Sequence, residues 1–209
     1  MFTEFATAAL VTMLVTLDPP GLAPIFLSLT RGMSAAERRQ VAVRASIIAF
    51  CIIGFFGVAG DVVLKALGVS LPAFRIAGGL LLFWIAFEMV FERRTERKQQ
   101  TADTAITKDH IRNVAAFPLA IPLMAGPGAL TATILLAGRA HGDAVLLITL
   151  AVICGLVILC CLAVFLAASS ISKLLGITGN VVLTRLLGVI LAALAVQFVI
   201  DGVKAAMAG

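Results

Sequence analysis

The stretch that decides the fold is FATAALVTMLVTLDPPGLAPIFLSL, residues 5–29. Its one ionisable residue, Asp18, lies near the middle of an otherwise uncharged run and is followed directly by Pro19-Pro20-Gly21. About 20 consecutive apolar residues are enough to cross the hydrocarbon core of a bilayer. Proline removes a backbone donor and interrupts a helix. The stretch therefore predicts a membrane-spanning helix that is broken at Asp18.

The rest of the chain has the same character. Of the 209 residues, 61% are hydrophobic and 13% are charged, whereas soluble domains have about 45–50% apolar and about 25% charged residues. This composition excludes an ordinary cytosolic enzyme, a nucleic-acid-binding module and a disordered linker. We expect a non-enzymatic all-α protein whose residues 1–209 form one transmembrane domain in the lipid bilayer. Five further spans are predicted, at about 41–64, 70–91, 113–137, 144–168 and 181–204.

The basic residues predict the orientation of these spans. Eleven lie in the loops that follow the first, third and fifth spans, namely Arg31, Arg38, Arg39, Arg44, Arg93, Arg94, Arg97, Lys98, Lys108, Arg112 and Lys173. Loops rich in Lys and Arg stay in the cytoplasm, so both termini are expected on the periplasmic side. The net charge of +5 thus reflects topology rather than a nucleic-acid partner. The longest polar segment, about 93–112, is expected to be a solvated cytoplasmic loop between the halves.

The two halves of the chain share features at nearly constant spacing. Pro20-Gly21 and Pro127-Gly128 are 107 positions apart (127 − 20), and Arg75 and Arg185 are 110 apart (185 − 75). We predict two inverted three-helix repeats, about 1–92 and 113–209, with helices 1 and 4 broken at mid-membrane. Such repeats with matching breaks indicate a secondary transporter whose site lies at the breaks.

The breaks suggest what would bind there. Freed N–H groups and the positive end of a half-helix attract an anionic group such as a carboxylate. The second break, Gly126-Pro127-Gly128, has no acidic residue, and Thr131 follows one turn later. Pro20 and Gly21 begin the other half-helix. Asp18 either caps its own half-helix or binds a substrate ammonium or a coupling H⁺ or Na⁺. A small zwitterion fits this pair of ends.

Other residues leave alternatives open. Arg75 and Arg185 either reach to an interface or form gating ion pairs with Glu88 or Asp201. Cys51 and Cys160 are 109 positions apart (160 − 51); they are either buried apolar groups or the thiols of a transmembrane electron carrier. The two histidines have no partners at metal-ligand spacing, so no metal and no organic cofactor are expected. Glycine-rich helix faces would permit a homodimer.

Three motifs resemble those of the MarC family of membrane proteins. They are DPPGLAPIFL (18–27), FRIAGGLLLF (74–83) and PLAIPLMAGPGA (118–129), and the resemblance covers nearly the whole chain. It implies a six-span protein of the bacterial inner membrane. It also implies kinship with the SnatA-type transporters of small neutral amino acids.

The resemblance also assigns residues, namely Asp18, Pro20, Gly21, Pro24, Gly126, Pro127 and Gly128. Leu22 departs from the family pattern, which usually has a polar residue there, often Asn, so the specificity could differ. The leading hypothesis is an alternating-access carrier of glycine, alanine or serine. Efflux of drugs or other small molecules is the alternative.

Overall fold

The computed structural model of the chain describes residues 2–94, 96–100, 114–140 and 142–208. These residues are helical with short connections and contain no strand. Five helical spans are long and apolar enough to cross a membrane, and a bent pair makes a sixth. The elements are α1 (Phe2–Leu17), α2 (Pro19–Leu29), α3 (Ala35–Ala66), α4 (Leu71–Val90), η1 (Ala115–Met124), α6 (Pro127–Arg139), α7 (Ala144–Leu166) and α8 (Ala168–Ala208). The all-α membrane fold is confirmed.

The first span is broken where the sequence predicts. Asp18 separates α1 from α2 and has a left-handed backbone, with φ of 55°. Pro19 and Pro20 occupy the first turn of α2, where a missing N–H leaves no bond unmade. The Asp18 carboxylate accepts a hydrogen bond from the Gly21 N–H at 3.2 Å. The break thus begins a new, capped helix.

The fourth span bends more sharply. The irregular helical segment η1 and the helix α6 meet at 56°. Phe117 and Ile121 have extended backbones within η1, each preceding a proline joined by a cis peptide bond. At the bend, a Cβ on Gly126 would lie 2.3 Å from the Pro122 carbonyl oxygen. Only glycine fits there.

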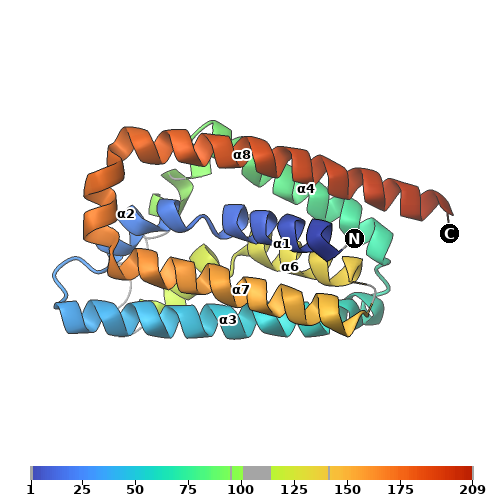
Figure 1. Cartoon of the computed structure of the whole chain (residues 1–209), viewed down its shortest axis with the longest axis horizontal. Helices are drawn as coiled ribbons and strands as arrows, with labels where there is room; N and C mark the ends of the chain where they lie inside the picture. Colours follow the sequence, from blue (N-terminus) through green and yellow to red (C-terminus); the bar gives the residue numbers. More distant parts are fainter. Residues whose placement is uncertain (1, 95, 101–113, 141, 209) are drawn as a thin grey trace.

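The helices pack as pairs drawn from the two halves of the chain. In Figure 1, α3 and α7 run together along one side and α4 and α8 along the other, with α1 and α6 between them. The contact between α4 and α8 is the most extensive of all, and α3 packs on α7 and also on α6 and η1. Each pairing joins elements at corresponding positions of the predicted repeats, although the inverted relation itself stays a prediction.

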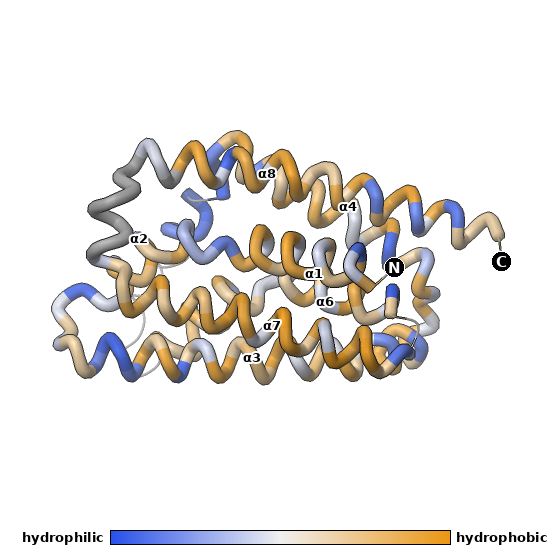
Figure 2. The backbone as a smooth tube through the Cα atoms, viewed as in Figure 1, coloured by the Kyte–Doolittle hydropathy of each residue, from blue (hydrophilic) through white to orange (hydrophobic). Residues whose placement is uncertain are grey.

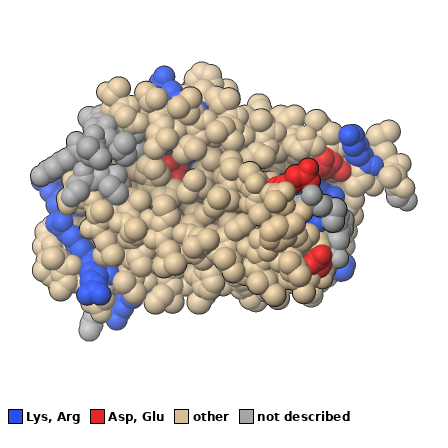
Figure 3. All heavy atoms as spheres, in the orientation of Figure 1, with Lys and Arg blue, Asp and Glu red and all other residues tan. Residues whose placement is uncertain are grey.

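The outer surface of the bundle is apolar along its length. Figure 2 shows hydrophobic residues on the outer sides of the long helices and hydrophilic ones mainly towards the two ends. In Figure 3, Lys and Arg gather at the end that holds the α2–α3 connection, whereas most visible Asp and Glu lie towards the end with both termini. Such an apolar belt between polar ends is what a bilayer requires.

One sequence prediction needs correction. The expected solvated loop is partly helical, because residues 93–94 and 96–100 form helix. Arg94 and Lys98 are buried in the bundle, with 6% and 8% of their surfaces exposed. Four residues apart, they share one helix face, and that face meets polar groups at the first break. The predicted span at 181–204 agrees with the membrane-spanning part of α8, Val181–Ala208, although the helix itself begins at Ala168. The remainder of the predicted loop, 101–112, lies outside the described residues.

Candidate functional site

A small cavity lies at the second helix break and beside the end of α1. It has a volume of ≈ 210 Å³ and is formed by α1, α4, the η1–α6 bend and the helical residues 93–94 and 96–100. Thr16, two residues before Asp18, forms one wall. The other lining residues are Leu81, Trp84, Ile85, Arg94, Arg97, Lys98, Pro122, Leu123, Met124, Gly126, Pro127, Gly128 and Ala129. The fold therefore brings the second break and the end of α1, just before the first break, to one cavity.

The N-terminus of α6 contributes unpaired backbone donors to this cavity. Gly126 is the N-cap residue and supplies no side-chain hydrogen bond, unlike Asp18 at the start of α2. Gly128 and Ala129 belong to the first turn, whose N–H groups have no partner within the helix. A helix N-terminus carries about half a positive charge. This end of the cavity therefore favours an anionic group.

Arg94 adds a full positive charge. Its guanidinium donates to the Thr16 carbonyl oxygen and contacts the Met89 sulfur at 2.8 Å. Among the described residues, no carboxylate forms an ion pair with Arg94. Burial lowers the pKa of Arg94, and the nearby Asp18 partly opposes that effect. An arginine remains protonated in proteins, so Arg94 contributes a full positive charge to the cavity lining.

Lys98 pairs with the acidic residue at the first break. Its ammonium lies 3.2 Å from the second carboxylate oxygen of Asp18, and only 2% of Asp18 is exposed. Burial lowers the pKa of Lys98 to about 8, although the negative charge of Asp18 raises it. The sequence left open whether Asp18 caps a helix or binds a cation. In this structure Asp18 caps α2 and pairs with the chain's own Lys98, and a role in binding a substrate ammonium or a coupling ion stays a prediction.

Further contacts hold the 93–100 segment in place. Arg97 forms an ion pair with Glu88 at 2.9 Å, and the Gln99 side chain donates to the Ser28 hydroxyl at 3.1 Å. Sequence reasoning missed this segment because its charges suggested a solvated loop. The four-residue spacing of Arg94 and Lys98 was the signal of a helix with one basic face.

The predicted site residues divide into those at the cavity and those behind it. Gly126, Pro127 and Gly128 line the cavity. Asp18 lies behind Lys98, and Pro20 and Gly21 lie in the first turn of α2, so none of the three is a lining residue. Thr131 also lies outside the lining: its methyl group packs where a Cβ on Gly78 would be, 2.6 Å away.

The two predicted gating arginines have other partners. Arg75 donates to the Gly138 carbonyl oxygen at 3.3 Å, while Asp201 pairs with Arg139. Arg185 lies 3.4 Å from Glu92 in an exposed pair. In the described part of the chain, neither Arg75 nor Arg185 forms a direct ion pair with Glu88 or Asp201. That predicted pairing is therefore wrong, and a gating role for either arginine stays a prediction.

The cysteines are all free thiols. Cys51 and Cys160 are exposed on the outer surface, and Cys154 and Cys161 are buried. The described residues contain no group of three His, Cys, Asp or Glu side chains that could hold a metal ion.

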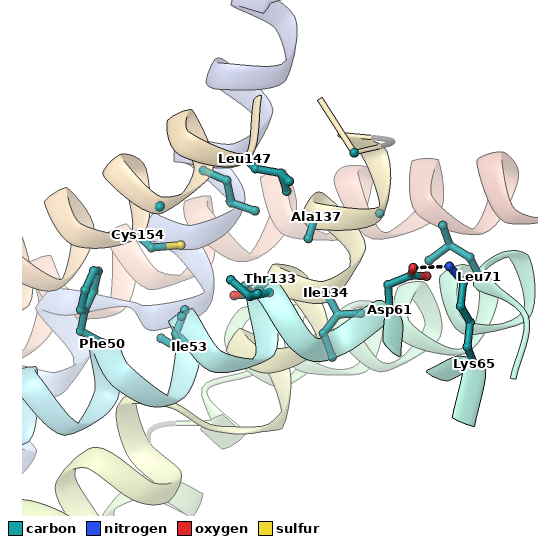
Figure 4. Close-up of a pocket in the computed structure, with 17 residues that line it drawn as sticks. Phe50, Ile53, Asp61, Lys65, Leu71, Thr133, Ile134, Ala137, Leu147 and Cys154 are labelled. Atoms are coloured by element: carbon teal, nitrogen blue, oxygen red, sulfur yellow. Dashed lines mark ion pairs between the residues drawn. The ribbon is translucent and has the colours of Figure 1, made fainter. Parts of the chain in front are cut away.

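A second, larger cavity of ≈ 700 Å³ lies away from the breaks. It is a cleft between α3 and α7 with α6 as its floor. Figure 4 shows Phe50, Ile53, Ile134 and Leu147 among its walls, with the Asp61–Lys65 ion pair at one end. Its lining is mostly apolar, in contrast to the basic cavity at the breaks.

The chain resembles one family of membrane proteins along almost its full length. The model of the family described as "MarC family integral membrane protein" matches residues 3–207. A "UPF0056 membrane protein" of Archaeoglobus fulgidus is 38% identical, covering 96% of this chain and 93% of the relative. One of Aquifex aeolicus is 35% identical (94% and 91%), and "UPF0056 membrane protein YhcE" of Escherichia coli is 35% identical (92% and 88%). No solved structure matches this chain.

Proposed function

This chain belongs to the MarC family of integral membrane proteins, and from that premise we propose that it is a secondary transporter of small neutral amino acids. The observation that carries the proposal is the basic cavity at the second break, beside the end of α1. The uncapped start of α6 and the Arg94 guanidinium converge on it. Backbone N–H groups at a helix start together with an arginine are suited to a carboxylate.

The size of the cavity supports a small substrate. Pockets for drug-sized ligands have volumes of about 300–1,000 Å³, whereas this cavity has ≈ 210 Å³. A water molecule takes about 30 Å³ in the liquid, so the cavity is a few waters in size. Glycine, alanine and serine are zwitterions on this scale. The printed names of the relatives specify no substrate, so the substrate rests on this chemistry and on the family resemblance.

The amino group of the substrate needs a carboxylate. Asp18 is the acidic residue beside the cavity, and the Lys98 ammonium occupies it in this structure at 3.2 Å. In the proposed cycle, the substrate ammonium replaces Lys98 on Asp18 while its carboxylate binds the start of α6 and Arg94. Coupling to H⁺ or Na⁺ would act through the same carboxylate, because protonation or cation binding there competes with Lys98.

The packing of the bundle supports alternating access. The pairs α3–α7 and α4–α8 each join corresponding elements of the two halves, as a two-fold relation between inverted repeats would require. Rocking one half against the other around a fixed central site is the usual way in which such folds alternate. The gathering of Lys and Arg at one end (Figure 3) supports a cytoplasmic position for that end. Both termini then face the periplasm of a bacterial inner membrane.

Uptake into liposomes containing the purified chain tests this proposal. We expect saturable glycine or alanine uptake driven by an imposed H⁺ or Na⁺ gradient. Competition by propionate or ethylamine, which carry one end of the zwitterion each, should be weaker than by alanine. Losing a hydrogen bond to a charged group costs about 1.5–3 kcal/mol, so Arg94→Met is expected to reduce uptake about 10- to 150-fold. Arg93→Met is the matched control, because the neighbouring Arg93 is exposed.

Efflux of apolar compounds is the second candidate function. The observation in its favour is the cleft of ≈ 700 Å³, whose volume lies in the range of drug-sized pockets. If the folded protein moves a hydrophobic dye but no amino acid under either gradient, efflux replaces the amino acid proposal. Equal losses in Arg93→Met and Arg94→Met would likewise remove the cavity from the mechanism.

A further inference from the structure

The α3–α7 cleft offers an apolar trough with a polar end. Its floor includes Thr133, whose hydroxyl donates to the Ala129 carbonyl oxygen at 2.8 Å and so has no need of a ligand. Asp61 and Lys65, 2.6 Å apart, lie at one end of the cleft, and Phe50 and Cys154 lie at the other (Figure 4). A ligand for this cleft therefore needs a long apolar part and one polar head.

Gly54 keeps the cleft open. The neighbouring glycines on α3 are used for packing, since a Cβ on Gly57 would lie 3.2 Å from Thr133 and one on Gly60 would lie 2.8 Å from Ile134. A Cβ on Gly54 would meet nothing within 4 Å. Glycine inside a helix is less favourable than alanine, so helix packing gives no reason for glycine at 54. The space beside it is room that an outside molecule can fill.

The mouth of the cleft faces the lipid-exposed surface. Phe50 and Val58 line the cleft and are also exposed, at 43% and 85%. On the opposite wall, Ala151 of α7 is also exposed. In a bilayer these side chains contact acyl chains. An apolar void beside them would forfeit dispersion contacts, so a neighbouring acyl chain gains contacts by entering.

The dimensions match one leaflet. From Phe50 to Asp61 is 11 residues (61 − 50), and at 1.5 Å per residue this is about 17 Å along α3. Half of a ~30 Å hydrocarbon core is about 15 Å. The Asp61–Lys65 pair is therefore at the depth of the lipid headgroups. Its side chains are 52% and 75% exposed, so both can turn to a ligand.

We propose that the α3–α7 cleft is a specific binding site for one phospholipid with a zwitterionic ethanolamine head. One acyl chain lies in the trough beside Gly54. The lipid phosphate binds Lys65, and the lipid ammonium binds Asp61. This site is separate from the basic cavity at the helix breaks and does not depend on the proposed transport activity.

Native mass spectrometry of the full chain released from bilayers tests the site. The bilayers contain equal amounts of phosphatidylethanolamine and phosphatidylglycerol. The wild-type chain is expected to retain one phosphatidylethanolamine. A Cβ at position 54 meets nothing within 4 Å, so Gly54→Leu is designed to place apolar bulk in the trough and should lower the retained fraction at least about tenfold. Ala193→Leu is the matched control, because it adds apolar bulk at an exposed position outside the cleft.

Two further variants separate the trough from the head site. Ala151→Leu narrows the cleft from the α7 wall and should repeat the loss even if Gly54→Leu folds poorly. Asp61→Asn combined with Lys65→Gln should retain one lipid but lose the preference for phosphatidylethanolamine. Equal retention in wild type, Gly54→Leu and Ala151→Leu would overturn the proposal. So would an apolar drug-like compound that binds the cleft while the wild-type chain retains no lipid.

Discussion

Replacing Asp18 by Asn is expected to lower the pKa of Lys98 strongly. Asn keeps the geometry of the break, since it is a good N-cap residue and tolerates the left-handed backbone at this position. The substitution therefore removes the charge and little else. The Lys98 ammonium lies 3.2 Å from the carboxylate, and both groups are buried, so solvent screens the interaction weakly.

The magnitude follows from that geometry. An opposite charge at this range changes a pKa by about 1–3 pH units. The wild-type pKa of Lys98 is about 8, so the variant should have a value of about 5–7. That difference corresponds to about 1.4–4 kcal/mol of interaction. Lys98 would then change from mostly charged to largely neutral at pH 7.

Carbon-13 NMR of the chain labelled at lysine Cε measures this directly. Lys98→Met identifies the Lys98 signal by its absence, and its titration is followed from pH 5 to pH 10 in wild type and in Asp18→Asn. The exposed Asp61–Lys65 pair on α3 is the matched control, because an exposed ion pair contributes little; Asp61→Asn should leave the Lys98 titration unchanged. A Lys98 midpoint that moves by less than about 0.5 pH units on Asp18→Asn would refute the buried ion pair.

Three other outcomes follow from the same contacts. The folded-state pKa of Lys98 is below its usual 10.5, so the free energy that Lys98 adds to folding is present above about pH 10.5 and is lost as pH falls through about 8. The thermal stability of wild type minus that of Lys98→Met should therefore rise between these two pH values. A difference that stays flat over that range would contradict the prediction. In Gly79→Ala, the new Cβ would lie 2.8 Å from the Ala195 carbonyl oxygen. This overpacking should cost about 1–3 kcal/mol and lower the Tm by about 2–12 °C. An unchanged Tm would show that α4 and α8 can move apart to accept the methyl group. Arg139→Met should lower the free energy of unfolding by about 1–2 kcal/mol, because it breaks a half-buried ion pair with Asp201. Adding Asp201→Asn should lower it little further, because the pair is already broken.

The spans and breaks could be predicted because each depends on residues within one short stretch of the sequence. Apolar runs of fixed length mark the spans, and a proline after an aspartate marks a helix start wherever it occurs. The sequence therefore predicts the break at Asp18 and the uncapped glycines at 126–128 without knowledge of their neighbours. It also predicts, from the similarity of the two halves, that both breaks belong to one site. The cavity is lined by the second break and by Thr16 at the end of α1, while Asp18 and Gly21 lie outside its lining, so the shared site stays a prediction.

The partners of the buried charges could not be predicted in the same way. Lys98 and Asp18 are 80 residues apart, and the pattern around Lys98 is that of a solvated basic segment. Whether such a segment stays in water or folds inward depends on the acceptors that the rest of the bundle offers. The partners of Arg75 and Arg185 could not be predicted for the same reason, because tertiary packing rather than spacing along a helix determines them.

The distance in sequence between Asp18 and Lys98 has a consequence for how the protein is made. The first span enters the membrane with an acidic residue near its middle, which costs about 2.5–3.5 kcal/mol at the centre of a helix. Its cation follows 80 residues later. At about 5–20 residues per second, the ribosome needs about 4–16 s to supply it. Over that interval the first helix depends on the insertion machinery or on a protonated Asp18 to remain in the bilayer. Its break acquires its final ion pair only after the third span has also entered the bilayer.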